Sequence, residues 1–364
     1  MKIAELHGEH GDNVDIIFPK EWVPLGFNFL PKYRHLSGLK PWKHKNLLIT
    51  PYTYPRLPHN RYPFWLLPYV KTNLKKFISN YEGIEVVHGH YILPDGWIAN
   101  QIARYLNIPS VITIRSSDIK LLKKAGKPSH SWQLAEITLR EATVLHCLNG
   151  PAQKFIIENF NIESIIVPHG IPKDLLGKKI LREKDIDLLV VAESIERKRI
   201  NWVINSFKSF KKLKKDQSRK LVVVGGGPKL NELKSIAGNA SGIQFTGKIP
   251  HHQVIKLMKR SRVFALPSVQ ETFGLAYLEA AANANAIIGL KGEGIDGVFT
   301  EKDGALFPQN YAEFNKMVEH LIVEKDVSRK LGMAAYRKAQ TLGWKKIISD
   351  YRKLYYSANY NKPQ

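Results

Sequence analysis

The sequence predicts an α/β protein of two domains, each with a doubly wound parallel sheet that is covered by helices on both faces. The chain has 364 residues, and at roughly 150 residues per domain this length corresponds to about two domains. Short runs rich in Val and Ile alternate with helix-length amphipathic stretches, which is the pattern of a parallel sheet between two helical layers. A turn-rich stretch at residues 168–172, followed by the charged residues 173–185, divides this pattern into two units. We therefore place the N-terminal domain at residues 1–172, the C-terminal domain at residues 173–340 and a final helix at residues 341–364.

Each expected strand is a short apolar run bounded by turn residues, and each expected helix is an amphipathic stretch between two such runs. In the N-terminal half we expect strands at Val14–Pro19, Asn46–Thr50, Ile84–Gly89, Ser110–Ile114, Val144–Leu148 and Ser164–Val167. In the C-terminal half we expect strands at Asp187–Ala192, Lys220–Val224, Gly242–Phe245, Val263–Leu266 and Ala286–Leu290. Helices are expected between most of these strands, for example at Gly96–Tyr105, Trp132–Glu141, Trp202–Leu213 and Gln253–Lys259.

The beginning of the chain does not fit a complete doubly wound domain, which opens with a strand, a Gly-rich turn and a helix. The residues before the first expected strand are too few for all three. Met1–His7 has the pattern of the end of a first helix that stops at Gly8 and Gly11. Two explanations remain open: the true start lies upstream, which we favour, or the domain lacks its first strand and Gly-rich loop.

Composition places the chain among globular proteins and gives it an unusual charge. Hydrophobic residues make up 44% and charged residues 24%, which excludes a disordered chain. The formal net charge is +23, which favours anionic partners such as nucleic acid, an acidic membrane leaflet or phosphorylated substrates. One cysteine, Cys147, allows no internal disulfide, and the sequence has no apolar run long enough for a membrane span. Because the first residues turn polar at once, we expect no signal peptide. We therefore expect a cytoplasmic protein.

Much of the positive charge lies in residues 20–76, where Glu21 is the single acidic residue and aromatic residues are interleaved with Lys and Arg. Basic and aromatic residues together are typical of a patch that binds an anionic membrane surface. The same pairing can bind single-stranded nucleic acid, and many of these aromatics also fill the core. We expect attachment to vesicles that contain anionic lipid, and we expect Lys71, Lys75 and Lys76 to contribute to it.

The richest stretch for chemistry is Phe264–Ala280, where an apolar strand ends at Pro267 and a helix is expected to begin near Thr272 or Phe273. A helix N-terminus directly after a parallel strand presents free backbone N–H groups, which suit a phosphate. Glu271 lies at the mouth of that site, and Glu279, two turns further on, is placed to bind a ribose or sugar hydroxyl. The plain alternative is an acid that stabilises the helix dipole and an ordinary surface Glu.

This stretch resembles the signature of glycosyltransferase family 4, in which two glutamates flank a Phe-Gly turn: Glu271, Phe273, Gly274, Glu279 and Ala280 match it in place. The resemblance continues through further segments on both sides, namely His88–His90, Pro94–Gly96, Thr113–Asp118, Leu221–Pro228, Ile243–Ile249, Gly292–Ile295 and Asp303–Pro308. It implies the GT-B fold, two Rossmann-like domains that face each other across a cleft, with the last helix packing back toward the N-terminal domain. It also implies a retaining, metal-independent glycosyltransferase of the kind used in bacterial surface polysaccharide synthesis.

The resemblance assigns roles to individual residues. Glu279 would hold the ribose of a UDP- or GDP-linked sugar, Glu271 would contact the transferred sugar, and Lys198 would bind the diphosphate in place of a metal ion, so that no cofactor is expected. His90 is the acid–base candidate, with a satisfied structural histidine as its alternative, and Arg115 and Asp118 lie on the side of a saccharide or lipid-linked acceptor. The remaining donor-binding candidates are Arg197, Gly225, Gly226, Pro228, Gly247, Lys248, Ile249, Thr272, Phe273, Gly274 and Leu275.

Three departures from the family pattern affect these expectations. Glu193 stands where the family often has an arginine, so either Arg197 or Arg199 compensates or the diphosphate binds more weakly. Arg115 stands where many relatives have His, and the N-terminal Gly-rich loop is absent. His169, where the family more often has Asn, is expected to be structural.

Two rival functions remain. A nucleic-acid-binding protein would explain the charge but not the glutamate pair, Lys198 and the glycine turns, and a nucleotide-sugar epimerase shares the fold. The sequence does not name the sugar, the base, the acceptor or the oligomeric state.

Overall fold

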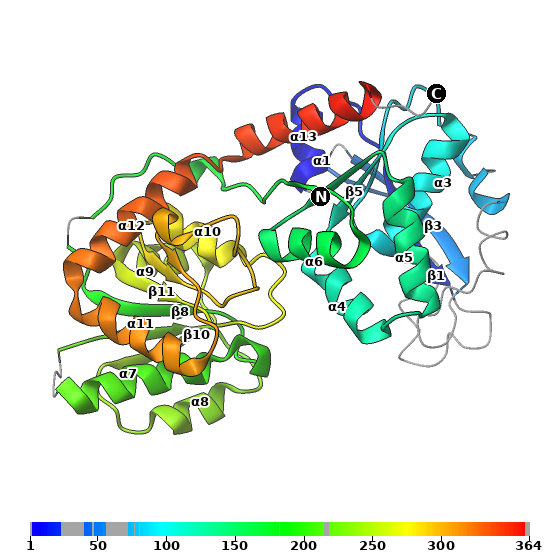
Figure 1. The fold of residues 1–364 in the computed structure, drawn as a ribbon. Coiled ribbons are helices and arrows are strands. Elements are labelled where there is room, and N and C mark those ends of the chain that lie inside the picture. The colour runs from blue at the N-terminus through cyan, green and yellow to red at the C-terminus, as the bar shows by residue number, and fades with distance from the viewer. Residues whose placement is uncertain are drawn as a thin grey trace.

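The computed structural model describes residues 2–22, 40–45, 47–55, 72–75, 77–79, 81–181, 183–214 and 218–360. They form two α/β domains side by side, with the last helix, α13 (Trp344–Tyr360), extending from the C-terminal domain over the N-terminal one (Figure 1). The predicted fold class is confirmed, and every expected strand has a counterpart. The short strands β2 (Trp42–His44) and β13 (Ala305–Leu306) were not predicted.

The C-terminal domain has a six-stranded, all-parallel sheet in the order β10-β9-β8-β11-β12-β13. Its other strands are β8 (Ile186–Val191), β9 (Leu221–Val224), β10 (Ile243–Gly247), β11 (Ser261–Ala265) and β12 (Ala286–Ile288). The strand order reverses between β8 and β11, and ligands of such sheets bind beyond the carboxyl ends of the strands at that switch point. The helices of this domain are α7 (Ile200–Lys214), α8 (Leu230–Ala237), α9 (His251–Arg260), α10 (Leu275–Ala282), α11 (Tyr311–Val323) and α12 (Lys325–Gln340).

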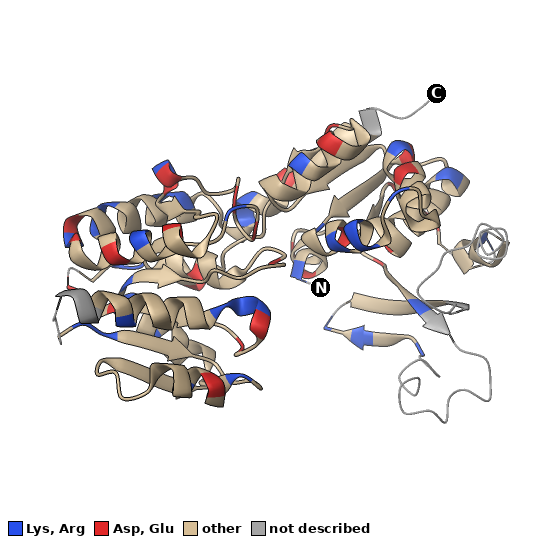
Figure 2. Ribbon diagram, turned by 60° about the horizontal axis from the view of Figure 1, so that its bottom comes forward, with Lys and Arg blue, Asp and Glu red and all other residues tan. Residues whose placement is uncertain are grey.

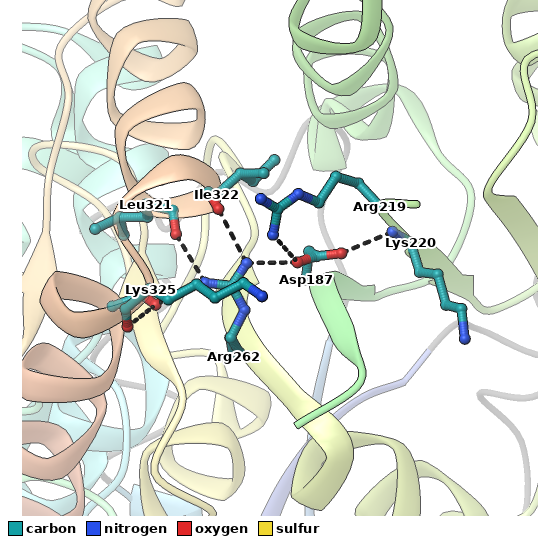
Figure 3. Close-up of polar contacts among 8 residues, drawn as sticks. Asp187, Arg219, Lys220, Arg262, Leu321, Ile322 and Lys325 are labelled. Atoms are coloured by element: carbon teal, nitrogen blue, oxygen red, sulfur yellow. Dashed lines mark hydrogen bonds and ion pairs between the residues drawn. The ribbon is translucent and has the colours of Figure 1, made fainter. Parts of the chain in front are cut away.

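The amino ends of β8 and β11 carry a buried ionic network, drawn in Figure 3. Asp187, the second residue of β8, pairs with Arg262, the second residue of β11. The second oxygen of Asp187 accepts a hydrogen bond from the backbone of Lys220 at 2.8 Å. The guanidinium of Arg262 also donates to the carbonyls of Leu321 (3.3 Å) and Ile322 (3.0 Å), so it caps the end of α11.

The N-terminal domain departs from the prediction of one sheet, because its described residues form two. The parallel sheet has the order β4 (Val87–Gly89), β5 (Ser110–Ile114), β6 (Val144–Cys147) and β7 (Ile165–Ile166). A separate sheet pairs β1 (Ile16–Trp22) in parallel and β2 antiparallel with β3 (Leu47–Pro55). The antiparallel pairing was missed because β2 has only three residues, all exposed, and no run of β-branched residues.

The helices of the N-terminal domain begin with α1 (Lys2–Glu9), which contains Gly8, so that glycine does not end the expected first helix. Further helices among the described residues are α3 (Trp97–Leu106), α4 (Ser116–Ala125), α5 (His130–Glu141) and α6 (Gly150–Phe160), with a π-helical turn at Ile92–Gly96 before α3. In the described part of the chain, 3₁₀ turns lie at Lys173–Leu175, Glu196–Lys198 and Glu301–Asp303.

The chain passes between the domains twice, and the two connecting segments are joined by backbone hydrogen bonds. Ile171 donates to the carbonyl of Leu342 at 2.8 Å and accepts from the backbone of Trp344 at 3.2 Å. Gly170 leaves room for the Trp344 ring, since a Cβ there would lie 2.5 Å from it. The joined segments precede α13 and fix where that helix starts.

Candidate active site

The loops after β8 and β11 meet at the switch point of the C-terminal sheet. Lys198 ends the 3₁₀ turn after β8, and its ammonium forms an ion pair with the carboxylate of Glu271, in the loop after β11. Arg197 places a guanidinium nitrogen 3.9 Å from the same carboxylate oxygen. The sequence motifs that predicted these three residues therefore come together in space, with two cations at one carboxylate.

The backbone around Glu271 is held from two sides. The carboxylate of Glu293 accepts a hydrogen bond from the Glu271 N–H at 2.8 Å, and Gly294 donates to the Glu271 carbonyl at 3.3 Å. Burial raises the pKa of the Glu293 carboxyl. The Val269 N–H donates to the carbonyl of Arg197 at 2.8 Å, which joins the two loops directly. Glu271 thus lies in a loop whose position is fixed by these hydrogen bonds.

The helix after this loop begins later than expected. α10 starts at Leu275, because Gly274 has φ 78°, in the left-handed region, and cannot continue a helix toward Thr272 or Phe273. A Cβ at Gly274 would also lie 2.6 Å from the Tyr277 ring, so no other residue fits. Tyr277 donates to the Gly274 carbonyl at 2.9 Å, and the N–H groups at the very start of a helix have no partner within it and can bind an anion.

The glycine turn after β9 packs directly on the Lys198 loop. A Cβ at Gly225 would lie 1.8 Å from the Ala192 carbonyl oxygen, and one at Gly227 would lie 2.8 Å from the Ser194 carbonyl oxygen. Gly225 also donates to the carbonyl of Gly247 at 2.9 Å, which places the 247–249 segment beside the turn. These contacts bring six predicted donor-binding residues together at the carboxyl ends of the strands: Gly225, Gly226, Pro228, Gly247, Lys248 and Ile249.

Glu279 lies apart from Glu271. It is five residues beyond Gly274, about 7.5 Å along a helix axis at 1.5 Å per residue. Its carboxylate binds the His251 ring at 2.9 Å, where α9 begins. The two glutamates of the motif thus have different partners, one a lysine in the loop after β8 and one a histidine at the start of α9.

Of the two arginines expected to compensate for Glu193, one lies beside Glu271 and the other does not. Arg199 has φ 48°, and its guanidinium carbon stacks 4.5 Å from the centre of the Trp202 ring, on α7. Arg197, by contrast, reaches Glu271. Arg197 is therefore the additional cation at the site.

On the opposite domain, Arg115, Asp118 and His90 form one connected group. Asp118 accepts hydrogen bonds from the backbone N–H groups of Arg115 (2.8 Å) and Ile92 (3.1 Å), and burial raises its pKa to about 7. Arg115 donates to the His90 carbonyl at 3.0 Å and stacks on the Tyr91 ring. These contacts fix the loop that carries His90.

The His90 ring is largely buried and is neutral at neutral pH. Burial, helped by the Arg115 charge, lowers its pKa to about 3. Its ring centroid is 4.3 Å from that of His88, and its Nδ1 is buried without a hydrogen-bond partner among the described residues. A neutral imidazole of this kind is suited to hydrogen bonding with a substrate hydroxyl rather than to removing a proton.

Sequence reasoning missed a buried histidine network beside His90. Thr113 Oγ1 hydrogen-bonds the Nε2 atoms of His88 and His146, both at 2.6 Å, and His88 Nδ1 bonds the Tyr355 hydroxyl at 2.8 Å. His88 and His146 lie in strands and Tyr355 on α13, so nothing local in the sequence joins them. His169 packs edge-on against Phe273 at a centroid distance of 5.1 Å, which places it at the contact between the domains.

The basic-aromatic segment lies largely outside the described residues, and with it Lys71 and Lys76. Within the described part of the chain, none of the helices has the length and apolar character that a membrane span needs. Figure 2 shows Lys and Arg on both domains.

Two parallel α/β domains whose carboxyl strand ends face each other define a GT-B fold. Solved structures agree: the chain matches sucrose-phosphate synthase from Thermosynechococcus elongatus with a TM-score of 0.69 at 18% identity, over 98% of this chain and 91% of that one. It matches the Anabaena protein HepE in complex with UDP with a TM-score of 0.66 at 11% identity, over 94% of this chain and all (100%) of that one.

Family models cover both domains. The model described as glycosyltransferase family 4 matches residues 3–175, and the model described as glycosyl transferases group 1 matches residues 173–338. The chain belongs to the family 4 type of glycosyltransferases. It is 24% identical to an uncharacterised glycosyltransferase of Methanocaldococcus jannaschii, over 86% of each chain. It is 25% identical to the alpha-monoglucosyldiacylglycerol synthase of Streptococcus pneumoniae, over 67% of this chain and 60% of that one.

Proposed function

We propose that this glycosyltransferase moves a sugar from a UDP- or GDP-linked donor to a saccharide or lipid-linked acceptor, with retention of configuration and without a metal ion. The observation that carries the proposal is the convergence of Lys198 and Arg197 on Glu271, at the switch point of the C-terminal sheet. The UDP in the HepE structure and the lipid product in the name of the pneumococcal relative support the two substrate classes.

The proposed step exchanges one bond for another. The acceptor hydroxyl oxygen bonds to the anomeric carbon of the sugar, the bond from that carbon to the diphosphate breaks, and the hydroxyl proton passes to the departing diphosphate. Negative charge grows on the diphosphate as it leaves, and preorganised cations lower the barrier to such a step. Lys198 and Arg197 supply that charge from the protein.

The ion pair gives Lys198 a second function before the donor arrives. The Lys198 and Glu271 side chains are 12% and 10% exposed, so an unpaired charge there would be poorly solvated. When a diphosphate binds, Lys198 has a stronger partner, and the Glu271 carboxylate is free to accept hydrogen bonds from sugar hydroxyls. The pair thus stabilises the empty site and opens on binding.

Metal independence rests on these two cations. The direct test is sugar transfer in the presence of EDTA, which we expect to proceed at an unchanged rate. Restoration of a lost rate by Mg²⁺ or Mn²⁺ would contradict metal independence.

The experiment for the function itself is a transfer assay with a panel of UDP- and GDP-sugars, preceded by thermal-shift screening. We expect a nucleotide sugar to raise the melting temperature, an oligonucleotide to leave it unchanged, and NMR of the product to show the anomeric configuration of the donor. An epimerised nucleotide sugar formed without acceptor would support the epimerase instead, and a shift with oligonucleotides alone would support nucleic-acid binding.

We further propose that an anionic membrane surface is a partner. On α4 the described residues Lys123 and Lys124 are exposed together with Leu121, whose side chain is 56% exposed, and this combination suits lipid headgroups and the acyl boundary. Co-sedimentation with phosphatidylglycerol vesicles at low salt tests it. Lys123→Glu with Lys124→Glu should reduce attachment, and Arg329→Glu with Lys330→Glu, on α12 of the other domain, should not. Equal attachment of both double variants and the parent would remove α4 from the proposal.

A further inference from the structure

Asn149 lies between the two domains and has no exposed surface. It follows β6 and is the N-cap of α6, where its side-chain oxygen accepts a hydrogen bond from the Ala152 N–H at 3.1 Å. Capping uses only the oxygen of the amide. The amide nitrogen, with two hydrogens to donate, is left for other partners.

The amide nitrogen of Asn149 forms two hydrogen bonds with the C-terminal domain. It donates to the carbonyl of Gly294 at 2.6 Å and to the carbonyl of Thr272 at 3.0 Å. Thr272 directly follows Glu271, and Gly294 donates its own N–H to the Glu271 carbonyl. One side chain of the N-terminal domain therefore holds both loops that fix Glu271.

The surrounding contacts converge on the same two loops. Ser116, at the start of α4, donates to the Thr272 carbonyl at 3.2 Å, and Lys120 donates to the Gln270 side chain at 2.7 Å. Gly150 donates to the Asp296 carbonyl at 3.1 Å. Gly150 also lies so close to Gly297 that a Cβ on either would come within 2.9 Å of the other's Cα. This close approach leaves Asn149 no room to move while the domains touch.

We propose that Asn149 is a positioning residue that couples contact between the domains to the placement of Glu271. When the domains meet, its amide fixes the Thr272 and Gly294 carbonyls, and with them the carboxylate that faces the transferred sugar. When the domains separate, water takes the place of those carbonyls and the loop loses this restraint. The inference rests on the proposed function, because it is the transfer step that requires Glu271 to be in place.

Two variants separate this role from capping. Asn149→Ser and Asn149→Asp both keep an oxygen that caps α6, and both lose the amide N–H groups. We expect kcat for sugar transfer to fall about 10- to 100-fold in each, since small displacements of a positioned group have effects of that size. Affinity for a nucleoside diphosphate, measured by calorimetry without acceptor, should stay within about twofold, because the donor residues lie on the other domain.

The pH profile gives a signature that a structural residue would not. In Asn149→Asp the new carboxyl can donate one hydrogen bond once it is protonated. Its kcat, relative to the parent, should therefore recover partly as the pH falls toward 5, whereas that of Asn149→Ser should not. Asn310→Asp is the matched control: Asn310 caps α11 in the same way, with its oxygen accepting from the Glu313 N–H at 3.0 Å, and it should keep the parent's kcat.

Small-angle scattering provides a readout that does not depend on activity. With a nucleoside diphosphate bound, both Asn149 variants should have a larger radius of gyration than the parent and Asn310→Asp. An unchanged kcat and radius in both variants would overturn the role of Asn149. A parent chain that transfers no sugar at all would instead contradict the proposed function, and the scattering result would still decide whether Asn149 joins the domains.

Discussion

In the C-terminal sheet, the amino ends of the strands (here called the amino edge) and their carboxyl ends (the carboxyl edge) each carry a buried carboxylate paired with a cation. The two pairs differ in what surrounds them. Asp187 and Arg262, at the amino edge, are each 10% exposed, as is Glu271 at the carboxyl edge. Asp187 has further donors in Arg219 and the Lys220 backbone, and Arg262 reaches carbonyls of α11 (Figure 3). Arg262 also donates to the Ser328 hydroxyl. At the carboxyl edge, by contrast, the described partner of the Lys198 ammonium is Glu271 alone.

Equal burial therefore does not mean equal function. The amino-edge network is closed, because protein groups take up the hydrogen-bonding capacity of both ions, and it serves to tie β8, β11 and α11 together. The carboxyl-edge pair is open, because an ammonium with three donors has room for a further anion. The same chemistry is structural at one edge of the sheet and available for a ligand at the other.

Breaking the closed pair should give the largest effect, and it should fall on stability. Arg262→Met removes the guanidinium that pairs with the buried Asp187 carboxylate. We therefore expect the free energy of unfolding to fall by about 3 kcal/mol in denaturant titrations. Arg260→Met, which removes an arginine from the exposed pair with Asp185, should change it by about 0–1 kcal/mol. Adding Asp187→Leu to Arg262→Met should restore much of the loss, and no recovery in the double variant would show that packing of Arg262, not charge, is what matters.

Breaking the open pair should act on turnover instead. Lys198→Ala removes a preorganised cation, and we expect kcat to fall by about a hundredfold or more. Because Arg197 remains 3.9 Å from the Glu271 carboxylate, the free energy of unfolding should fall less than in Arg262→Met. Arg199→Gly is the control, because it removes the adjacent cation that stacks on Trp202 and glycine accepts the φ of 48°. If Lys198→Ala destabilises the fold as much as Arg262→Met and keeps its kcat, the two edges do not differ as argued.

A third experiment extends the comparison to the carboxyl edge of the N-terminal sheet, where burial lowers the pKa of His146 to about 3. The unfolded chain binds a proton there below pH 6.5 and the folded chain does not, so His146 lowers stability as the pH falls from 6.5 toward 3. The slope is roughly 1.4 kcal/mol per pH unit, which gives about 2 kcal/mol at pH 5. Between pH 8 and pH 5 the parent should lose that much more unfolding free energy than His146→Gln.

The exposed His252 is the matched control for this experiment, and His252→Gln should lose stability in parallel with the parent. Asp95 and Asp118, whose pKa values burial raises to about 6 and about 7, act in the opposite direction. They are present in all three proteins, so they cancel in the difference. Parallel curves for the parent and His146→Gln would show that His146 is protonated as readily in the folded as in the unfolded chain.

How far the sequence predicts these regions depends on how local their contacts are. The alternation of strands and helices predicts the C-terminal sheet, and the stretch around Glu271 predicts a polar site at its carboxyl edge, because strand, turn and helix are contiguous there. The closed network joins Asp187 to Arg262 across 75 positions, and His88 to Tyr355 spans 267. Asn149 had a visible signal as an N-cap before Gly-Pro, but its partners lie on the other domain. Side chains that meet only after the sheets assemble leave no local pattern to find.

The smallest expected effect concerns Glu279, the motif's second glutamate, whose side chain is 19% exposed and whose partner in the structure is the exposed His251. If this carboxylate holds a ribose, Glu279→Gln replaces a charged acceptor by a neutral amide, and hydrogen bonds to charged groups are roughly twice as strong. We expect affinity for the nucleoside diphosphate to fall about five- to tenfold, near 1 kcal/mol, with kcat at saturating donor nearly unchanged. Glu271→Gln should do the reverse, reducing kcat with little change in nucleotide affinity, because Glu271 pairs with Lys198 and, in the proposed function, contacts the sugar rather than the ribose. Glu232→Gln, which removes a surface carboxylate paired with Lys229 on α8, is the control for the loss of one negative charge. Unchanged nucleotide affinity in Glu279→Gln would leave Glu279 as a partner of His251 alone, and it would place the ribose elsewhere along the carboxyl edge.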